Sequence, residues 1–274
     1  MRRALGAGWL LLLVCEGCSG MRTPAAPDPG GASGTPVRVL MLTATAGFRH
    51  DAIGTARQAL AAAAASAGDI TITPTEDLSA IARGPLGAYD VLMFALTTGE
   101  LPFSGDQKAA ILEFVNGGKG FIGVHSATDT LYEWPEYGRM IGAYFKEHPW
   151  TQTATVVVED ESHPAASGLG RSFQLLEEFY TFRENPRPHV QVLLRLDERS
   201  VGAAGDYPLA WTSSTGAGRV YYNALGHFSS TWTDVRFQRS CWARSGGRRA
   251  ASVGTDHAPA AHSPLTIANL RRCS

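Results

Sequence analysis

Short apolar runs alternate with stretches of helical periodicity in the first half of the chain. Four nearly continuous apolar runs predict strands buried on both faces, at residues 37–42, 70–73, 91–95 and 120–124. Between them, residues 52–67 and 106–116 place apolar side chains on one face at helical spacing. Gly68 favours the end of the first helix, and Ser104 with Gln107 forms a capping box before the second. This alternation predicts an α/β fold, with a doubly wound, mostly parallel sheet flanked by helices.

The second half of the chain predicts additional β strands. Residues 153–158 are rich in β-branched side chains, and residues 190–196 alternate apolar with polar positions, as in a half-buried strand. Residues 208–212 and 218–224 are expected to form a closing pair of strands. The extra strands therefore follow the parallel part of the fold.

Polar side chains stand where the predicted strands end. His125, Ser126 and Asp129 follow the run at 120–124, and His227 follows the last strand. Ligands of open α/β sheets bind outside the carboxyl ends of the strands, so these residues are the first candidates for a site. His50 lies near the start of the helix predicted at 52–67, where it could bind a ligand or simply close the helix end.

Two adjacent carboxylates, Glu177 and Glu178, lie among apolar and aromatic residues. Neighbouring residues of an extended chain point to opposite sides. Only one of the two glutamates can therefore point into a given crevice.

Residues 37–238 carry motifs that resemble the ThuA-like family, named for trehalose utilisation, whose fold is that of class I glutamine amidotransferases. The motifs are Gly47-Phe48-Arg49-His50, residues 120–130, His148-Pro149, His163-Pro164, Glu177-Glu178-Phe179-Tyr180 and Asn223-Ala224-Leu225-Gly226-His227. The resemblance implies a flavodoxin-like or amidotransferase-like sheet. It also implies that the motif residues meet in one cleft.

The likeness to amidotransferases ends at the chemistry. In that fold a nucleophilic cysteine occupies the turn after the strand equivalent to 120–124, and this chain has His125 there. Glutamine hydrolysis needs a thiolate to form the acyl intermediate, and imidazole does not replace it in that mechanism. We therefore expect no glutamine amidotransferase activity.

If the loops converge, His125 is the expected acid–base group, with Asp129 or Glu178 as its partner. The expected ligand contacts are His50, Ser126, Tyr180 and His227. His50, His125 and His227 are also candidate ligands for a divalent metal such as zinc. No histidine pair has the helical spacing of a known metal motif, so metal binding depends on convergence alone.

Structural alternatives accompany these assignments. His125 could be a histidine satisfied by Asp129, and His227 could cap the last strand. For the pairs His148-Pro149 and His163-Pro164, a role in shaping turns is favoured over a role in the site. Four aromatic residues could stack on a sugar ring or pack internally, namely Phe48, Trp134, Tyr180 and Trp232.

Net charge and the distribution of cysteines argue against a nucleic-acid partner and against cysteine-based sites. The formal net charge of −1 gives no basic face for nucleic acid. The four cysteines fall in the predicted leader and tail, at Cys15, Cys18, Cys241 and Cys273. This distribution argues against a disulfide framework, a thiolate zinc site or a cysteine nucleophile in the central domain.

The two ends of the chain differ from the body. Residues 1–18 resemble an export signal, and Cys18 lies in a context similar to that of a bacterial lipoprotein cysteine. The alternative is a cleaved signal peptide without lipid. Residues 19–36 predict a disordered linker and 37–238 the ThuA-like domain. Residues 239–274 have an atypical composition that indicates a disordered or frameshifted tail in place of a closing helix.

These observations predict an exported protein of the bacterial cell envelope that binds or processes carbohydrate, such as trehalose or related glycosides. The membrane is expected as a partner only through an N-terminal lipid anchor. Two alternatives stay open: a noncatalytic sugar-binding or scaffolding module, and a metal-dependent hydrolase of other small molecules.

Overall fold

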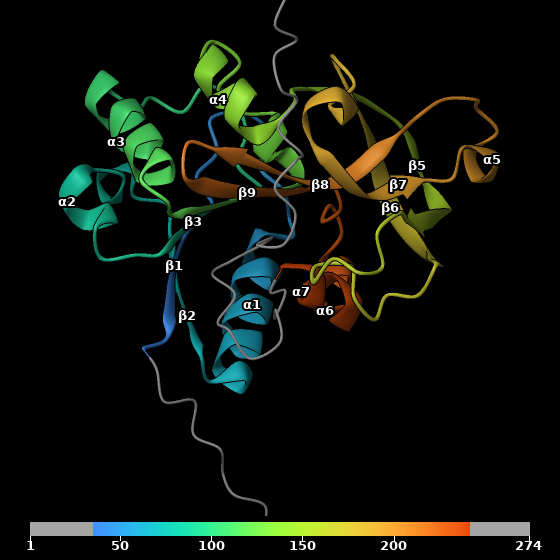
Figure 1. Cartoon of the computed structure of the whole chain (residues 1–274), viewed down its shortest axis with the longest axis horizontal. Coiled ribbons are helices and arrows are strands. Elements are labelled where there is room, and N and C mark those ends of the chain that lie inside the picture. The colour runs from blue at the N-terminus through green and yellow to red at the C-terminus, as the bar shows by residue number, and fades with distance from the viewer. Residues whose placement is uncertain (1–34, 242–274) are drawn as a thin grey trace, which may run out of the picture. The chain divides into compact units, whose positions relative to one another are not determined.

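A nine-stranded mixed sheet forms the centre of the protein in a computed structural model that describes residues 35–241 (Figure 1). The strand order is β2-β1-β3-β4-β9-β8-β7-β5-β6. The strands are β1 (Val37–Leu42), β2 (Ile70–Thr75), β3 (Val91–Ala95), β4 (Gly120–Val124), β5 (Phe145–Val158), β6 (Ser172–Phe182), β7 (Gln191–Leu196), β8 (Pro208–Thr215) and β9 (Gly218–Asn223).

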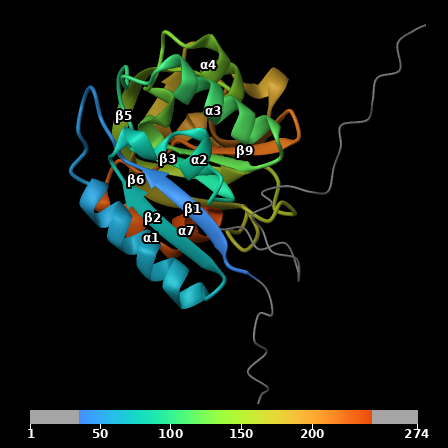
Figure 2. The same cartoon turned by 90° about the vertical axis from the view of Figure 1, so that its left-hand side faces the viewer.

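Helices cover both faces of the sheet. Those of the described chain are α1 (Ile53–Ala67), α2 (Arg83–Leu86), α3 (Gly105–Asn116), α4 (Pro135–Ile141), α5 (Glu198–Val201), α6 (Ser229–Thr233) and α7 (Val235–Cys241), with 3₁₀ turns η1 (Leu78–Ala80), η2 (His125–Thr128) and η3 (Arg187–His189). Helices α3 and α4 lie on one face, and α1, α6 and α7 lie on the other (Figures 1 and 2). The predicted capping box of α3 is present, with Ser104 and Gln107 bonded reciprocally.

The parallel half of the sheet, β2-β1-β3-β4-β9, has the flavodoxin-like strand order, with β9 in the fifth position. Strands β3 and β4 are buried along their whole length, as their continuous apolar sequences predict. The predicted doubly wound fold is confirmed. Because these five strands are parallel, the loops that follow β1, β4 and β9 emerge at one edge.

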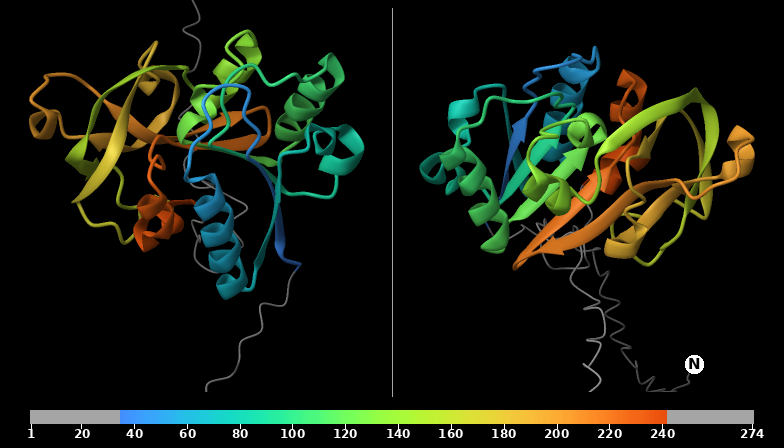
Figure 3. Two further views of the ribbon diagram at one scale, coloured as in Figure 1. Left: turned by 180° about the vertical axis from the view of Figure 1, so that it is seen from behind. Right: turned by 90° about the horizontal axis from the view of Figure 1, so that it is seen from above.

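The antiparallel half, β8-β7-β5-β6, extends the sheet beyond β9, so the prediction of added strands in the second half is confirmed (Figure 3). The predicted closing pair is β8 and β9, of which β9 also pairs in parallel with β4, and β6 is a strand that was not predicted from the sequence. Strand β5 begins at Phe145, well before the strand predicted at 153–158. Its early part pairs with β6 through shifts of register on either side of Glu147. Pro149 lies in this irregular segment, as expected of a residue with no backbone N–H to donate.

Helix α7 changes the expected boundary of the tail. It runs to Cys241, three residues past the end of the predicted domain, and buries Phe237 and Cys241. Cys241 is therefore a core residue, contrary to its assignment to a tail, and burial raises the pKa of its thiol to about 12. The leader, Cys18 and the tail from residue 242 onward lie outside the described residues. Within residues 35–241, no helix has both the length and the apolar composition needed to cross a membrane.

Candidate functional site

His125 occupies the sharp turn between β4 and η2. Its φ of 53° is in the left-handed region, which costs a residue other than glycine about 1–3 kcal/mol. Its side chain is completely buried, and Nδ1 lies 2.7 Å from the carbonyl oxygen of Ala224. A carbonyl only accepts, so Nδ1 carries a proton, and in the neutral imidazole Nε2 has the lone pair. The hydroxyl of Tyr180, 2.9 Å away, donates to that lone pair.

Three side chains from distant parts of the sequence meet around His125. We call His50, His125, Glu178 and His227 the histidine–glutamate cluster. Each offers one potential ligand atom, and these four atoms lie within 4.8 Å of one another. His50 precedes α1, His125 follows β4, and His227 follows β9, so the predicted convergence of the parallel loops is present. Glu178 reaches the cluster from β6.

Glu178 contacts both His125 and His227 of the cluster and the half-exposed His148. Its Oε2 is 3.6 Å from Nε2 of His125 and 3.1 Å from Nδ1 of His227. Its Oε1 is 3.2 Å from Nδ1 of His148, a side chain that is 48% exposed. Burial acts to raise the pKa of Glu178, but the contacts with His125 and His227 outweigh it and lower the pKa. Glu178 therefore stays a carboxylate at neutral pH.

The other two imidazoles of the cluster have buried nitrogen atoms with no hydrogen-bond partner in the described chain. These are Nδ1 of His50 and Nδ1 of His227. The 3.1 Å approach of His227 to Glu178 is thus an ionic contact without hydrogen-bond alignment, and it raises the pKa of His227. Burial and the neighbouring His125 and His227 lower the pKa of His50 to about 3, so His50 is neutral.

Glu177 faces away from the cluster and holds its loop. Its buried carboxylate accepts hydrogen bonds from the backbone N–H groups of Gly226 and His227 at 2.9 and 3.0 Å, and from the Thr231 hydroxyl at 2.7 Å. The expectation that only one of the adjacent glutamates enters the site agrees with this geometry. Glu177 positions the backbone of His227, while Glu178 points into the cluster.

Asp129 lies near the cluster without joining it. Its Oδ1 accepts a 2.6 Å hydrogen bond from the Tyr132 hydroxyl, and burial raises its pKa. The predicted role as partner of His125 falls instead to Ala224, Tyr180 and Glu178. Ser126 is buried, and its hydroxyl has no hydrogen-bond partner in the described chain.

His148 is a site residue that sequence reasoning assigned to a turn. It stacks near Phe145 and Tyr180, with ring centroids 6.0 and 6.2 Å apart, and contacts Glu178. The only signal in the sequence was its place in a motif of the family resemblance. His163 fits the structural alternative, since it is buried in a turn where Nδ1 accepts from the N–H of Ala165.

The donor set of the cluster fits a divalent metal of the zinc type, which binds imidazole nitrogen and carboxylate oxygen. The hydrogen bond from His125 to the Ala224 carbonyl is the kind of outer contact that orients a ligating imidazole. The neutral His50 supplies a further lone pair at Nδ1, and His227 supplies one in its deprotonated form. The cluster could therefore hold a metal ion.

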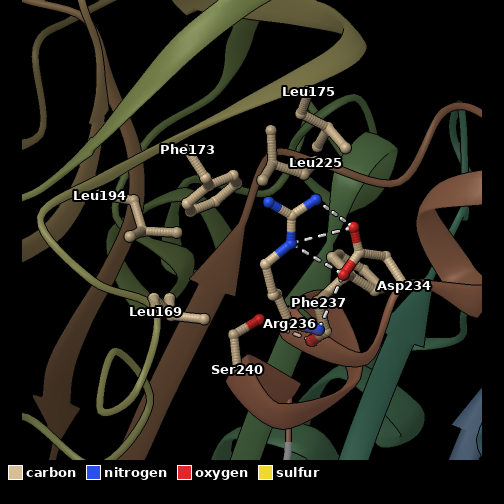
Figure 4. A pocket seen from close by; sticks show the side chains of 9 residues that line it. All are labelled: Leu169, Phe173, Leu175, Leu194, Leu225, Asp234, Arg236, Phe237 and Ser240. Atoms are coloured by element: carbon tan, nitrogen blue, oxygen red, sulfur yellow. Dashed lines mark hydrogen bonds and ion pairs between the residues drawn. The ribbon is translucent and has the colours of Figure 1, made fainter.

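A separate small pocket contains none of the four cluster residues. It is lined by Leu169, Phe173, Leu175, Leu194, Leu225, Asp234, Arg236, Phe237 and Ser240. Arg236 lies among these side chains, paired with Asp234, and its guanidinium is 4.8 Å from the ring centroid of Phe173 (Figure 4). This pocket belongs to the packing of α7 against β6 and β7.

Comparisons with known proteins agree on one family. The family model for ThuA, described as trehalose utilisation, matches residues 38–243. A crystal structure of a ThuA-like protein from Bacteroides uniformis ATCC 8492 is 25% identical with a TM-score of 0.65, covering 78% of this chain and 91% of that one. A ThuA-like protein from Parabacteroides merdae ATCC 43184 shares the fold at 18% identity and a TM-score of 0.60, covering 76% and 90%. No curated protein sequence matches this chain.

Proposed function

We propose, from the premise that this chain belongs to the ThuA family, that its histidine–glutamate cluster binds a divalent metal ion and acts on a carbohydrate. The observation that carries the proposal is the convergence of four ligand atoms within 4.8 Å, from four separate segments. The buried Nδ1 of His50 strengthens it, because a buried polar atom without a hydrogen-bond partner is rare unless a ligand satisfies it.

The residues of the site have different proposed roles. A divalent cation held there would supply Lewis acidity toward a hydroxyl or carbonyl oxygen of a sugar. Glu178 supplies negative charge. The hydrogen bond to Ala224 keeps the proton of His125 on Nδ1, so that Nε2 can act as a ligand or a base once the Tyr180 hydroxyl gives way. His148, half exposed beside Glu178, is placed to hydrogen-bond an incoming hydroxyl group.

The carbohydrate class rests on the family description, trehalose utilisation. We propose that amidotransferase chemistry is absent, because the turn after β4 carries His125. The one cysteine of the described chain, Cys241, is buried in α7 with a raised pKa, so it supplies no thiolate to this turn.

Metal binding is tested with the full chain, stripped of metal and titrated with zinc. We expect one tightly bound ion per chain by elemental analysis. Glu178→Gln should weaken zinc binding about 100-fold or more, because it removes the only anionic ligand. Glu184→Gln, an exposed glutamate just after β6, is the matched control and should bind as the parent does. Parent protein that takes up no stoichiometric metal would refute the metal site.

The same preparations distinguish catalysis from binding. Incubation with trehalose and other glycosides, with and without chelator, should release product only in the metal-loaded protein. His125→Ala should abolish that product. Saturable sugar binding without product would instead support a noncatalytic sugar-binding module.

A further inference from the structure

Phe48 is the one aromatic side chain among the large apolar residues that the described chain exposes, and it stands beside the cluster. It is 64% exposed, and its ring centroid lies 4.8 Å from that of His50 in an edge-to-face arrangement. The other exposed large apolar residues are Leu176 and Val235. Exposed apolar surface next to a buried polar cluster is typical of a ligand-binding site.

The loop that carries Phe48 is firmly held. The Thr98 hydroxyl donates a 2.7 Å hydrogen bond to the carbonyl of Phe48, and the backbone N–H of Ala46 donates to the Thr98 carbonyl at 2.8 Å. Gly99 allows this close approach, since a Cβ there would lie 2.8 Å from the backbone nitrogen of Gly47. Next to Phe48, Arg49 pairs with Glu76. The ring is therefore held in an exposed position by a fixed backbone.

The other aromatic candidates for stacking are not accessible. Trp134 and Trp232 are buried in the core, and Tyr180 is buried with its hydroxyl on His125. Among the four aromatic residues that the sequence singled out, only Phe48 presents a free face. On the polar side, His148 and His227 remain partly exposed next to Glu178.

This combination matches the chemistry of a pyranose, whose C–H face is apolar and whose rim carries hydroxyl groups. We infer that Phe48 is the stacking platform for a pyranose ring of the substrate, whose hydroxyl groups then face the histidine–glutamate cluster. The inference rests on the proposed function for the class of substrate. It is independent of metal binding, because phenylalanine has no ligand atom.

The test compares Phe48→Ala and Phe48→Trp in the full, zinc-loaded chain, with Val235→Ala as the control for loss of an exposed apolar side chain. Trehalose and methyl glucoside are the pyranose probes, sorbitol is the acyclic polyol, and calorimetry gives the affinities. We expect Phe48→Ala to weaken pyranoside binding about 10-fold, since a stacked ring contributes roughly that much. Phe48→Trp should restore it. Zinc content and sorbitol binding should be unchanged in both variants.

Pyranoside affinity that is equal in Phe48→Ala and the parent would overturn the inference. So would an equal loss for pyranosides and sorbitol, or a metal-loaded parent that binds no pyranoside. Pyranoside binding that depends on Phe48 in a chain that takes up no metal would support the platform while removing the metal site.

Discussion

In the parallel half of the sheet, the loops after β1, β4 and β9 each contribute one histidine to the cluster. In the antiparallel half, β6 contributes Glu178, and β5 contributes His148, which contacts Glu178 from outside the cluster. The three histidines of the parallel half lie in loops at strand ends, whereas His148 and Glu178 lie within strands. Tyr180 of β6 also reaches across to His125. Neither half holds the complete donor set. The site therefore lies where the two halves meet, a boundary that we call the seam.

The seam itself is joined by a buried carboxylate. Glu177, on β6, accepts three hydrogen bonds from the segment after β9. Its neighbour Glu178 completes the cluster from the same strand. One strand therefore both fixes the His227 loop and supplies the negative charge that the histidines lack.

The largest expected effect comes from breaking this connection. Glu177→Ala removes the acceptor of the Thr231 hydroxyl and of three backbone N–H groups, those of Glu178, Gly226 and His227, and should lower the free energy of unfolding by about 3 kcal/mol. Urea unfolding followed by circular dichroism measures the change. Glu184→Ala, an exposed glutamate close by in the sequence, should leave the transition unchanged. An unaltered midpoint in Glu177→Ala would show that these hydrogen bonds do not contribute to stability.

A smaller effect concerns a histidine of the antiparallel half outside the cluster. Burial lowers the pKa of His163, so the unfolded chain takes up this proton at a higher pH than the folded one does. Stability should therefore fall as pH drops below about 6.5, by no more than about 1.4 kcal/mol per pH unit from this group. Unfolding curves between pH 7 and 5 should show a shallower loss in His163→Gln. Equal slopes in the two proteins would contradict this account.

The smallest expected effect is on the contact that crosses the seam at His125. The Tyr180 hydroxyl occupies the Nε2 lone pair that a metal would use. Tyr180→Phe should therefore bind zinc about 5-fold more tightly, the equivalent of one modest hydrogen bond. Tyr207→Phe, whose hydroxyl bonds to the Ala204 carbonyl away from the cluster, is the control for the titration. Weaker zinc binding in Tyr180→Phe would mean that the hydroxyl supports the metal site.

Local sequence patterns were enough for most of the parallel half. Strands β1, β3 and β4 are nearly continuous apolar runs, and the end of a buried strand is visible in sequence as the point where polar residues begin. His50, His125 and His227 could therefore be placed at one edge of the sheet. Glu178 entered through the family resemblance, and the alternation of an extended chain showed that Glu177 and Glu178 must serve different sides.

Tertiary structure alone decided the rest. Asp129 follows the same strand as His125, yet its carboxylate accepts a hydrogen bond from Tyr132 and makes none with His125, because side-chain direction after a turn is not a local pattern. His148 reaches Glu178 through the irregular pairing of β5 with β6 around Pro149, which no periodicity reports. The sequence by itself determined which elements form and which residues end them. Packing of the antiparallel half against the parallel half determined which of those residues touch, because contacts between distant segments depend on register and on the direction of each side chain.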